Sequence, residues 1–239
     1  MNGIIFERLK LVAQQGIIAD LYDLIREDVK LLDHFDELPF VETPLHTAVS
    51  AGHIPFVMEI MRLKPSFAKK PDPEGFCPIH LALQNWGELN HDIALQNRRM
   101  VIRLLQVDGD LVLVKGKEGM TPLHYAAETD DHILLDEFLS VCPHSIEAVT
   151  SRNETALHIA LKHNRVEAFK RLERWLRKKR STNEKFWHSK ILNREDEEGN
   201  TVLHIAVLKN QPEVSTLQPP FLNYLRTKET IKNLCCECL

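Results

Sequence analysis

The sequence has little of what marks several specialised classes of protein. No run of about 18 consecutive apolar residues occurs in its 239 residues, so we expect no membrane-spanning helix. With 9 glycines, 12 prolines and 5 cysteines it lacks the composition of a collagenous chain or a disulfide scaffold, and 44% hydrophobic content excludes a disordered chain. The composition predicts a soluble globular chain of one or two domains with a sizeable core.

The five cysteines do not form a disulfide framework. Cys77 and Cys142 stand alone in the body of the chain, whereas Cys235, Cys236 and Cys238 lie at its C-terminal end. An odd number without framework spacing fits reduced thiols in a cytosolic protein. The terminal group also lacks the spacing of a prenylation motif or a tetrahedral metal site, so we expect an unmodified, disordered end, with palmitoylation as the alternative.

The charge balance gives no reason to expect a nucleic-acid partner. The formal net charge is -4, from 30 basic and 34 acidic side chains, and the pI is about 6.3. A chain of this charge has no overall field that attracts polyanions. Glu7, Arg8 and Lys10 interrupt any apolar segment of the kind that a secretory signal needs, so we expect a cytoplasmic protein.

A repeated six-residue pattern is the strongest signal in the sequence. Its histidines, at positions 46, 80, 124, 158 and 204, are 34, 44, 34 and 46 residues apart, which is a period near 33 with two insertions of about 10 to 12 residues. The five copies are Thr43-Pro44-Leu45-His46-Thr47-Ala48, Cys77-Pro78-Ile79-His80-Leu81-Ala82, Thr121-Pro122-Leu123-His124-Tyr125-Ala126, Thr155-Ala156-Leu157-His158-Ile159-Ala160 and Thr201-Val202-Leu203-His204-Ile205-Ala206.

Each copy has the chemistry of a helix start. A threonine hydroxyl caps an unpaired N–H of the first turn, and proline suits the first helical position because its φ is already helical. The helices are therefore predicted to begin at Pro44, Pro78, Pro122, Ala156 and Val202. Residues that tolerate positive φ precede four of the copies and predict tight turns there: Gly75, Gly119, Asn153 and Gly199.

A second apolar stripe at helical spacing follows each histidine. Examples are Phe56, Val57, Ile60 and Met61, and further along Leu134, Leu135, Phe138 and Leu139. Each unit is thus a turn followed by a helix pair, and such a pair cannot bury its apolar face alone. Neighbouring units are therefore predicted to stack.

The repeated histidines are predicted to hold the fold rather than a metal. At the third helical position each can bond the capping residue and local backbone, and one histidine per repeat does not converge with the others. Cys77 and His80 are three apart, but no second pair follows at zinc-finger spacing. No hydrolase, kinase or metalloprotease motif occurs, so we expect neither an enzyme nor a cofactor.

These residues resemble the ankyrin-repeat family, whose signature Thr-Pro-Leu-His-x-Ala is met in full at 43–48 and 121–126. The resemblance covers roughly residues 1–214 and implies an all-α solenoid of stacked helix-turn-helix units with turn fingers. The expected parts are a degenerate N-terminal capping repeat at 1–36, repeats at 37–70, 71–114 with an insertion, 115–148 and 149–194 with a basic insertion, a partial repeat at 195–214 and an irregular tail at 215–239.

A narrower resemblance is to plant ankyrin proteins of the accelerated-cell-death and bian-da type. It is carried by Ile191-Leu192-Asn193 with Asp196, Gly199-Asn200-Thr201, Leu203-His204-Ile205-Ala206 and Lys209-Asn210-Gln211. In that group the repeats usually precede a membrane-spanning C-terminal region and act in defence signalling. Here Pro219 and Pro220 interrupt the final unit, so we expect the tail to cap the last repeat instead of spanning a membrane.

The resemblance implies a binding surface, because turn tips and first helices line one concave side while the signature residues maintain the fold. We predict a monomeric, non-enzymatic protein-interaction module or scaffold in plant defence or stress signalling, with a protein partner of unknown identity. Its expected contact residues are Glu74, Phe76, Gln84, Asn85, Glu118, Met120, Glu128, Thr129, Arg152, Glu154, Lys162, His163, Glu198, Asn200 and Lys209. Phe76 and Met120 are either exposed anchors for a partner or packing residues under the adjacent turn.

One basic block supports an alternative function. It comprises Lys170, Arg171, Arg174, Arg177, Lys178, Lys179 and Arg180. A solvated helix face is one interpretation, which the acidic run 195–198 would help to neutralise; binding of an anionic lipid, an acidic protein or nucleic acid is the other. Together with an acylated cysteine tail, the block would make the chain a peripheral membrane adaptor, since stable anchoring takes two signals.

Overall fold

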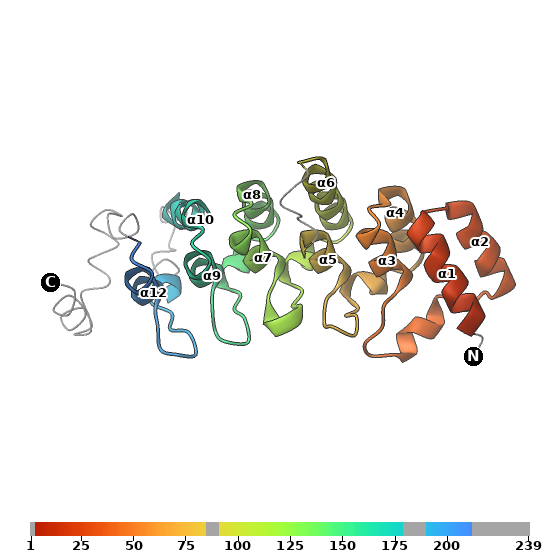
Figure 1. The fold of residues 1–239 in the computed structure, drawn as a ribbon, viewed down its shortest axis with the longest axis horizontal. Coiled ribbons are helices and arrows are strands. Elements are labelled where there is room, and N and C mark those ends of the chain that lie inside the picture. The colour runs from red at the N-terminus through yellow and green to blue at the C-terminus, as the bar shows by residue number, and fades with distance from the viewer. Residues whose placement is uncertain (1–2, 85–90, 179–189, 212–239) are drawn as a thin grey trace. The chain divides into compact units, whose positions relative to one another are not determined.

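The computed structural model describes residues 3–84, 91–178 and 190–211 (Figure 1). All regular elements in these ranges are helices, and no residue in them lies in a β-strand. The all-α fold predicted from the sequence is therefore confirmed. The chain divides into two compact units, one of residues 1–125 and 136–145 and the other of residues 126–135 and 146–239.

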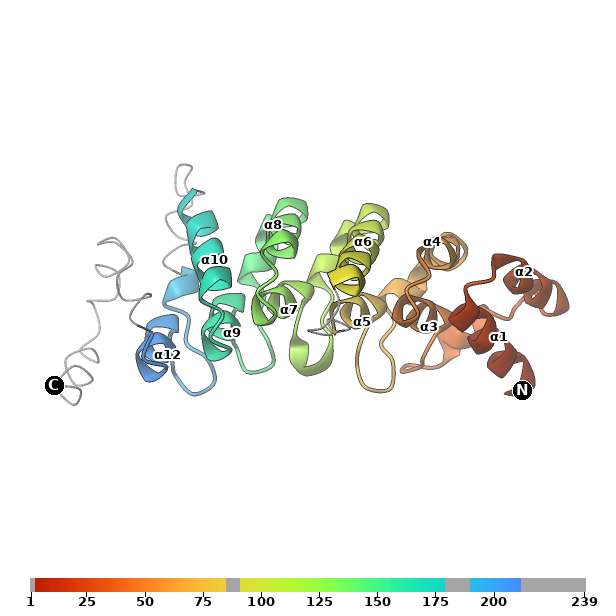
Figure 2. The ribbon, with the colours of Figure 1, turned by 45° about the horizontal axis from the view of Figure 1, so that its top comes forward.

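The first unit is a row of helix pairs. Its pairs are α1 (Gly3–Gln15) with α2 (Ile18–Glu27), α3 (Pro44–Ser50) with α4 (Ile54–Leu63), and α5 (Pro78–Gln84) with α6 (His91–Val107). α3 packs against both α1 and α5, so the first helices form one layer, and α4 and α6 lie on one side of it (Figures 1 and 2). The 3-10 helices between the pairs are η1 (Asp33–Glu37), η2 (Pro65–Lys69), η3 (Gly109–Leu113) and η4 (Lys117–Gly119).

The second unit repeats this arrangement. It contains α9 (Ala156–Lys162), α10 (Val166–Lys178) and α12 (Val202–Leu208), and both α10 and α12 pack on α9. The remaining helices contribute residues to both units: α7 (Pro122–Glu128), α8 (His132–Val141) and the 3-10 helix η5 (Pro143–Glu147).

The second helix of each pair supplies the core, as its apolar spacing predicts. On α4, Phe56, Val57, Ile60 and Met61 recur at intervals of one, three and four residues, and none is more than 1% exposed. Burying side chains of this size stabilises a fold by about 1.5 to 3 kcal/mol each. The same holds for α8, where Leu134, Leu135, Phe138 and Leu139 are buried. The first helices contribute to the same core, with residues such as Leu45 and Leu157 at 0% exposure.

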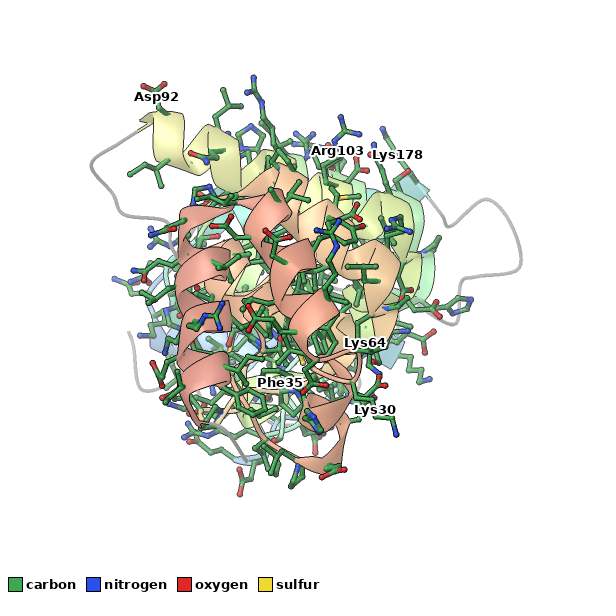
Figure 3. All side chains as sticks on the ribbon, turned by 90° about the vertical axis from the view of Figure 1, so that its right-hand side faces the viewer. Lys30, Phe35, Lys64, Asp92, Arg103 and Lys178 are labelled. Atoms are coloured by element: carbon green, nitrogen blue, oxygen red, sulfur yellow. The ribbon has the colours of Figure 1, made fainter. Side chains whose placement is uncertain are left out.

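An aromatic row closes the base of the N-terminal pair. The rings of Phe6 and Phe35 meet edge to face with centroids 5.1 Å apart, and Phe35 meets Phe67 in the same way at 5.6 Å. Figure 3 shows Phe35 within the base of this end of the chain, while Lys30 and Lys64 lie at its surface. The row connects α1 to the 3-10 helices that follow α2 and α4.

All five predicted helix starts are confirmed. The helices α3, α5, α7, α9 and α12 begin at Pro44, Pro78, Pro122, Ala156 and Val202. The positive φ predicted for the turn residues is also found, from 59° at Asn153 to 88° at Gly75. The capping residue and the turn residue are local signals, which is why the sequence alone locates these boundaries.

The C-terminal predictions fall outside the described part of the chain. The tail at 215–239, its cysteines and its capping role stay predictions. On α12, Val207 and Leu208 are 43% and 66% exposed. Within the described ranges, no helix combines the length and the apolar character needed to cross a membrane.

Candidate functional site

A hairpin loop, called a finger here, precedes each of four first helices. The fingers are residues 72–76, 116–120, 150–154 and 196–200. In each, the backbone N–H of the first residue donates to the carbonyl of the fifth, over 2.8 Å at Asp72 and 3.0 Å at Thr150. The positive-φ residue stands fourth, and its N–H donates to the carbonyl of the first residue. Each finger is thus closed by its own backbone, so its closure does not depend on the side chains at its tip.

The first finger residue usually stiffens the loop through its side chain. Asp72 Oδ1 accepts the N–H of Phe76 at 2.8 Å. Asp196 Oδ1 accepts two, from Glu198 at 3.0 Å and Asn200 at 2.8 Å. Carboxylates that accept backbone N–H groups in this way fix the turn, so the fingers present their tips in a defined geometry.

The repeat histidines cap their helices, as predicted. The Thr43 N–H donates to Nδ1 of His46 at 3.1 Å, and the same bond recurs at His80, His124, His158 and His204. Because Nδ1 accepts, Nε2 carries the proton, and at His46 it lies 3.1 Å from the Phe76 carbonyl in the next finger. This second bond, which the sequence analysis did not foresee, ties one repeat to the next.

Burial keeps three of these imidazoles, those of His46, His80 and His158, neutral. Loss of solvent lowers the pKa of His46 and of His158, and it lowers the pKa of His80 to about 4. In the described ranges no group of three or more histidine, cysteine, aspartate and glutamate side chains is arranged to hold a metal ion. The capping hydrogen bonds thus explain the repeat histidines as residues that maintain the fold.

The expected contact residues differ in their exposure. Seven line the finger tips and the ends of first helices with exposed side chains: Glu74, Gln84, Glu118, Arg152, His163, Glu198 and Lys209. A second group is half-buried: Phe76, Met120, Glu128, Thr129, Lys162 and Asn200. Asn85 lies outside the described residues, and Glu154 is buried.

The structure corrects the sequence analysis at Glu154, and it bears on the two alternatives that were left open for Phe76 and Met120. Glu154 is 6% exposed, because its carboxylate accepts the Thr150 hydroxyl at 3.1 Å and pairs with Lys162. Phe76 and Met120 are half-buried rather than exposed, and the Lys117 ammonium lies 5.8 Å from the centre of the Phe76 ring. A neighbouring turn thus covers part of the surface that was expected to be open.

The basic block is partly neutralised within α10. Lys170 pairs with Glu167 at 2.9 Å, and Arg177 pairs with Glu173 at 2.5 Å. Arg174 and Lys178 are exposed and Arg171 is half-buried, whereas Lys179 and Arg180 lie outside the described residues. Two cations of the block are therefore paired with acidic residues of the same helix, and both interpretations of the block stay predictions.

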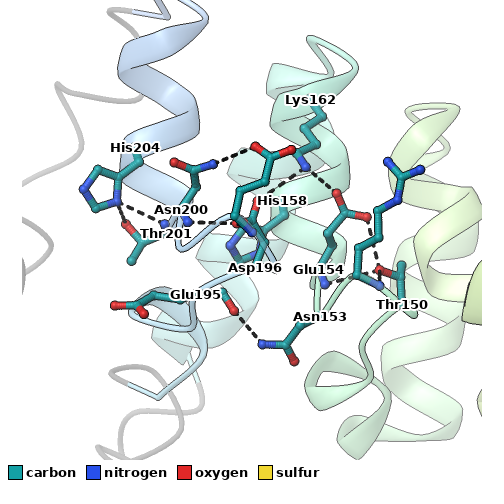
Figure 4. Close-up of polar contacts among 12 residues, drawn as sticks. Thr150, Asn153, Glu154, His158, Lys162, Glu195, Asp196, Asn200, Thr201 and His204 are labelled. Atoms are coloured by element: carbon teal, nitrogen blue, oxygen red, sulfur yellow. Dashed lines mark hydrogen bonds and ion pairs between the residues drawn. The ribbon is translucent and has the colours of Figure 1, made fainter.

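A charged pocket opens beside the finger at 196–200. We call it the acidic pocket, and its volume is about 470 Å³. It is lined by Arg152, Glu154, Lys162, Asp196, Glu197 and Glu198. Figure 4 shows Lys162 between Glu154 and Asp196. All six residues belong to the second unit.

Lys162 organises the floor of the acidic pocket. Its ammonium pairs with Glu154 and lies 3.4 Å from Asp196 Oδ2. Burial would lower the pKa of Lys162, but the two carboxylates outweigh it and raise the pKa. Burial would likewise raise the pKa of Asp196, but the Asn200 N–H and the Lys162 ammonium hold it below its usual value. Both groups are charged at neutral pH.

The sequence analysis found four of the six residues that line this pocket. Arg152, Glu154, Lys162 and Glu198 were expected contact residues, whereas Asp196 and Glu197 were not. The available signal was an aspartate three residues before a turn glycine, which marks a side chain turned back onto its own loop. Lys162, which lies 34 residues earlier in the chain, pairs with the same carboxylate. This is a tertiary contact, and the local sequence pattern does not predict it.

An apolar pocket of about 380 Å³ lies in the first unit, beside α1 and α3. Its lining includes Phe6, Leu9, Phe35, Leu38 and Val41, and the Lys10–Glu42 ion pair, at 2.8 Å, borders it.

The fold and these fingers define a helical repeat protein that presents variable side chains on finger tips. Residues 89–183 match the family model described as ankyrin repeats (3 copies), so the chain contains a segment of ankyrin repeats there. Such repeats form protein-interaction modules.

Two curated relatives share part of the chain. It is 50% identical over 68 residues to ankyrin repeat-containing protein BDA1 of Arabidopsis thaliana, which is 28% of this chain and 16% of the relative. It is 33% identical over 122 residues to a Danio rerio protein named "Putative palmitoyltransferase ZDHHC13", which is 50% of this chain and 17% of that relative. The matched segments thus span about a sixth of each relative's length.

The fold also resembles a solved structure. A chain in the complex titled "Bd0816 Predatory Endopeptidase from Bdellovibrio bacteriovorus in complex with immunity protein Bd3460" superposes with a TM-score of 0.60 at 18% identity, covering 92% of this chain and 98% of that one. At this identity the likeness shows the fold alone.

Proposed function

We propose that the chain is a non-enzymatic scaffold that binds a protein partner through its finger face. The finger face comprises the finger tips and the C-terminal ends of the first helices, with the exposed residues Glu74, Gln84, Glu118, Arg152, His163, Glu198 and Lys209. Each compact unit carries its own part of this face.

One observation carries the proposal: the buried positions of each repeat maintain the fold, whereas the exposed finger positions do not. Thr43 and His46, like their counterparts at Thr121 and His124, are 0% exposed and bonded within the repeat. Between them stand charged residues such as Glu74 and Glu118, which have no buried or capping role. Side chains that the fold does not need, on loops held rigid by backbone bonds, are the usual basis of a binding surface.

The finer proposal is a role in plant defence or stress signalling, in the cytoplasm. It is supported by the 50% identity to the Arabidopsis protein over 68 residues and by the residues that resemble the accelerated-cell-death and bian-da type.

Affinity capture from plant cell extract, with mass spectrometry, tests the scaffold proposal through a matched pair of variants. Arg152→Glu changes a finger tip, and Arg103→Glu makes the same charge reversal on α6, where Figure 3 shows Arg103 at the outer surface. Glu74→Arg extends the test to the first unit. We expect the enriched partner to be lost with the finger variants and kept with Arg103→Glu. Retention of every partner by both finger variants would contradict the proposal.

A further inference from the structure

We propose that the acidic pocket receives an arginine side chain of the protein partner. This inference rests on the proposed function and deepens it, because it assigns one chemical group of the partner to one place on the finger face.

The charge of the pocket sets the sign of its ligand. Its lining has four carboxylates and two cations, which leaves two negative charges in excess. Lys162 offsets one of the two negative charges of the buried pair Glu154 and Asp196, so one remains at the floor. The other excess charge lies at the rim, where Glu197 and Glu198 are exposed and Arg152 opposes them.

One carboxylate oxygen on the floor of the pocket accepts no hydrogen bond from the described residues. Asp196 Oδ1 is occupied by two backbone N–H groups, but Oδ2 accepts no hydrogen bond within the described structure although its side chain is 1% exposed. Its contact with Lys162, at 3.4 Å, is an ion pair longer than a normal hydrogen bond. A buried carboxylate oxygen in this state favours a further N–H donor.

The rim supplies further acceptors. The Glu197 side chain makes no hydrogen bond or ion pair with any other described residue, and Glu198 receives only the Asn200 amide, at 3.1 Å. A guanidinium carries five N–H donors in a planar fork that matches carboxylate oxygens, whereas an ammonium is a compact point charge. Because the acceptors are spread from floor to rim, arginine fits them better than lysine. Lys162 holds the position between the buried carboxylates.

The combination is specific to this place in the chain. Preceding repeats have Phe76 with Gln84, and Met120 with Glu128, at the positions of Glu154 and Lys162. Neither pair joins a buried acid to a base. The pocket therefore gives the second unit a recognition element of its own.

Amide NMR on the full chain with short peptides tests the inference. The probes are blocked glycine-flanked pentapeptides with arginine, lysine or citrulline at the centre, titrated at low salt. We expect the arginine peptide to shift the amides of residues 152–154 and 196–200, to bind more tightly than the lysine peptide, and citrulline to cause no shift. Citrulline keeps the shape of arginine without its charge.

Variants locate the binding. Glu197→Gln with Glu198→Gln is expected to raise the Kd of the arginine peptide by at least about threefold, because each exposed charge pair contributes modestly. Glu74→Gln with Glu118→Gln removes two charges from other finger tips and should leave the Kd unchanged. The inference is overturned if the citrulline or lysine peptide binds as well as arginine, if the shifts fall elsewhere, or if both double variants weaken binding equally. Such a result would not change the outcome of the affinity-capture experiment. The arginine inference and the scaffold proposal can therefore be refuted independently.

Discussion

The imidazole ring of His80 fills the space beside Gly116 that any side chain there would need. A Cβ at residue 116 would lie 2.8 Å from ring atoms Cε1 and Nδ1 of His80. The φ of Gly116 is -98°, which every residue tolerates, so close approach and not backbone conformation requires this glycine. The equivalent finger positions hold Asp72, Thr150 and Asp196.

Gly116→Ala is therefore expected to destabilise the fold by about 1 to 3 kcal/mol, because the displaced ring is fully buried and caps a helix. Gly199→Ala is the matched control: its Cβ would meet nothing within 4 Å, but its φ is +79°, which costs about 1 kcal/mol. Urea unfolding of both variants measures the difference. An unchanged midpoint for Gly116→Ala would show that the ring moves aside freely.

Acid is expected to weaken the fold well before its carboxylates protonate. His80 titrates near 6.5 when unfolded and near 4 in the fold, so its stabilising effect is complete above pH 6.5 and is lost as pH falls toward 4. Between pH 7.5 and 5 this one residue should cost about 2 kcal/mol, and the lowered pKa values of His46 and His158 add in the same direction.

Urea unfolding at pH 7.5, 6.5, 5.5 and 5 measures this loss. Carboxylates whose pKa is lowered in the fold, such as Asp196, lose their stabilising effect only below about pH 4.5. Their titration therefore does not affect measurements between pH 7.5 and 5. In His80→Asn the side chain cannot protonate, and the pH dependence should be shallower. A free energy of unfolding that stays flat from pH 7.5 to 5 would refute the assignment.

Signature and finger residues are expected to respond differently to truncation. His124 is 0% exposed and its Nδ1 accepts the Thr121 N–H at 3.1 Å, so His124→Ala leaves a buried donor unpaired and should cost about 1 to 3 kcal/mol. Phe76→Ala with Met120→Ala removes two half-buried side chains and should lower partner affinity at a smaller cost in stability. Thermal melts and binding curves separate the two effects. If the double variant unfolds first, these side chains serve packing and not binding.

Anionic vesicles are expected to bind the chain only weakly. Two of the α10 cations are paired with Glu167 and Glu173, which reduces the charge available to lipid. Sedimentation with vesicles of equal parts phosphatidylserine and phosphatidylcholine, at increasing salt, measures this. Strong binding that salt abolishes, and that Arg174→Glu with Lys178→Glu removes, would favour the membrane-adaptor alternative instead.

Local patterns predicted the helix starts and turns because capping and positive φ are decided within a few residues, as at Pro44 and Asn153. They did not predict that Glu154 is buried, because its partner Lys162 is on the far end of the next helix and Asp196 is in the following finger. Likewise, the bond from His46 to the Phe76 carbonyl spans 30 residues. Contacts between repeats depend on how the repeats stack, and the six-residue patterns do not predict the stacking geometry.

The central claim, that the finger face binds the partner, is tested most directly by photo-crosslinking in cells. A photoreactive phenylalanine analogue is placed at Glu74, Glu118 or Arg152 on finger tips, and at Arg103 or Ile133 on second helices, all of them exposed. We predict that the finger positions crosslink to one common protein and that the second-helix positions do not. Crosslinks confined to Arg103 and Ile133 would contradict the claim and assign the interaction to the opposite side of the helix pairs.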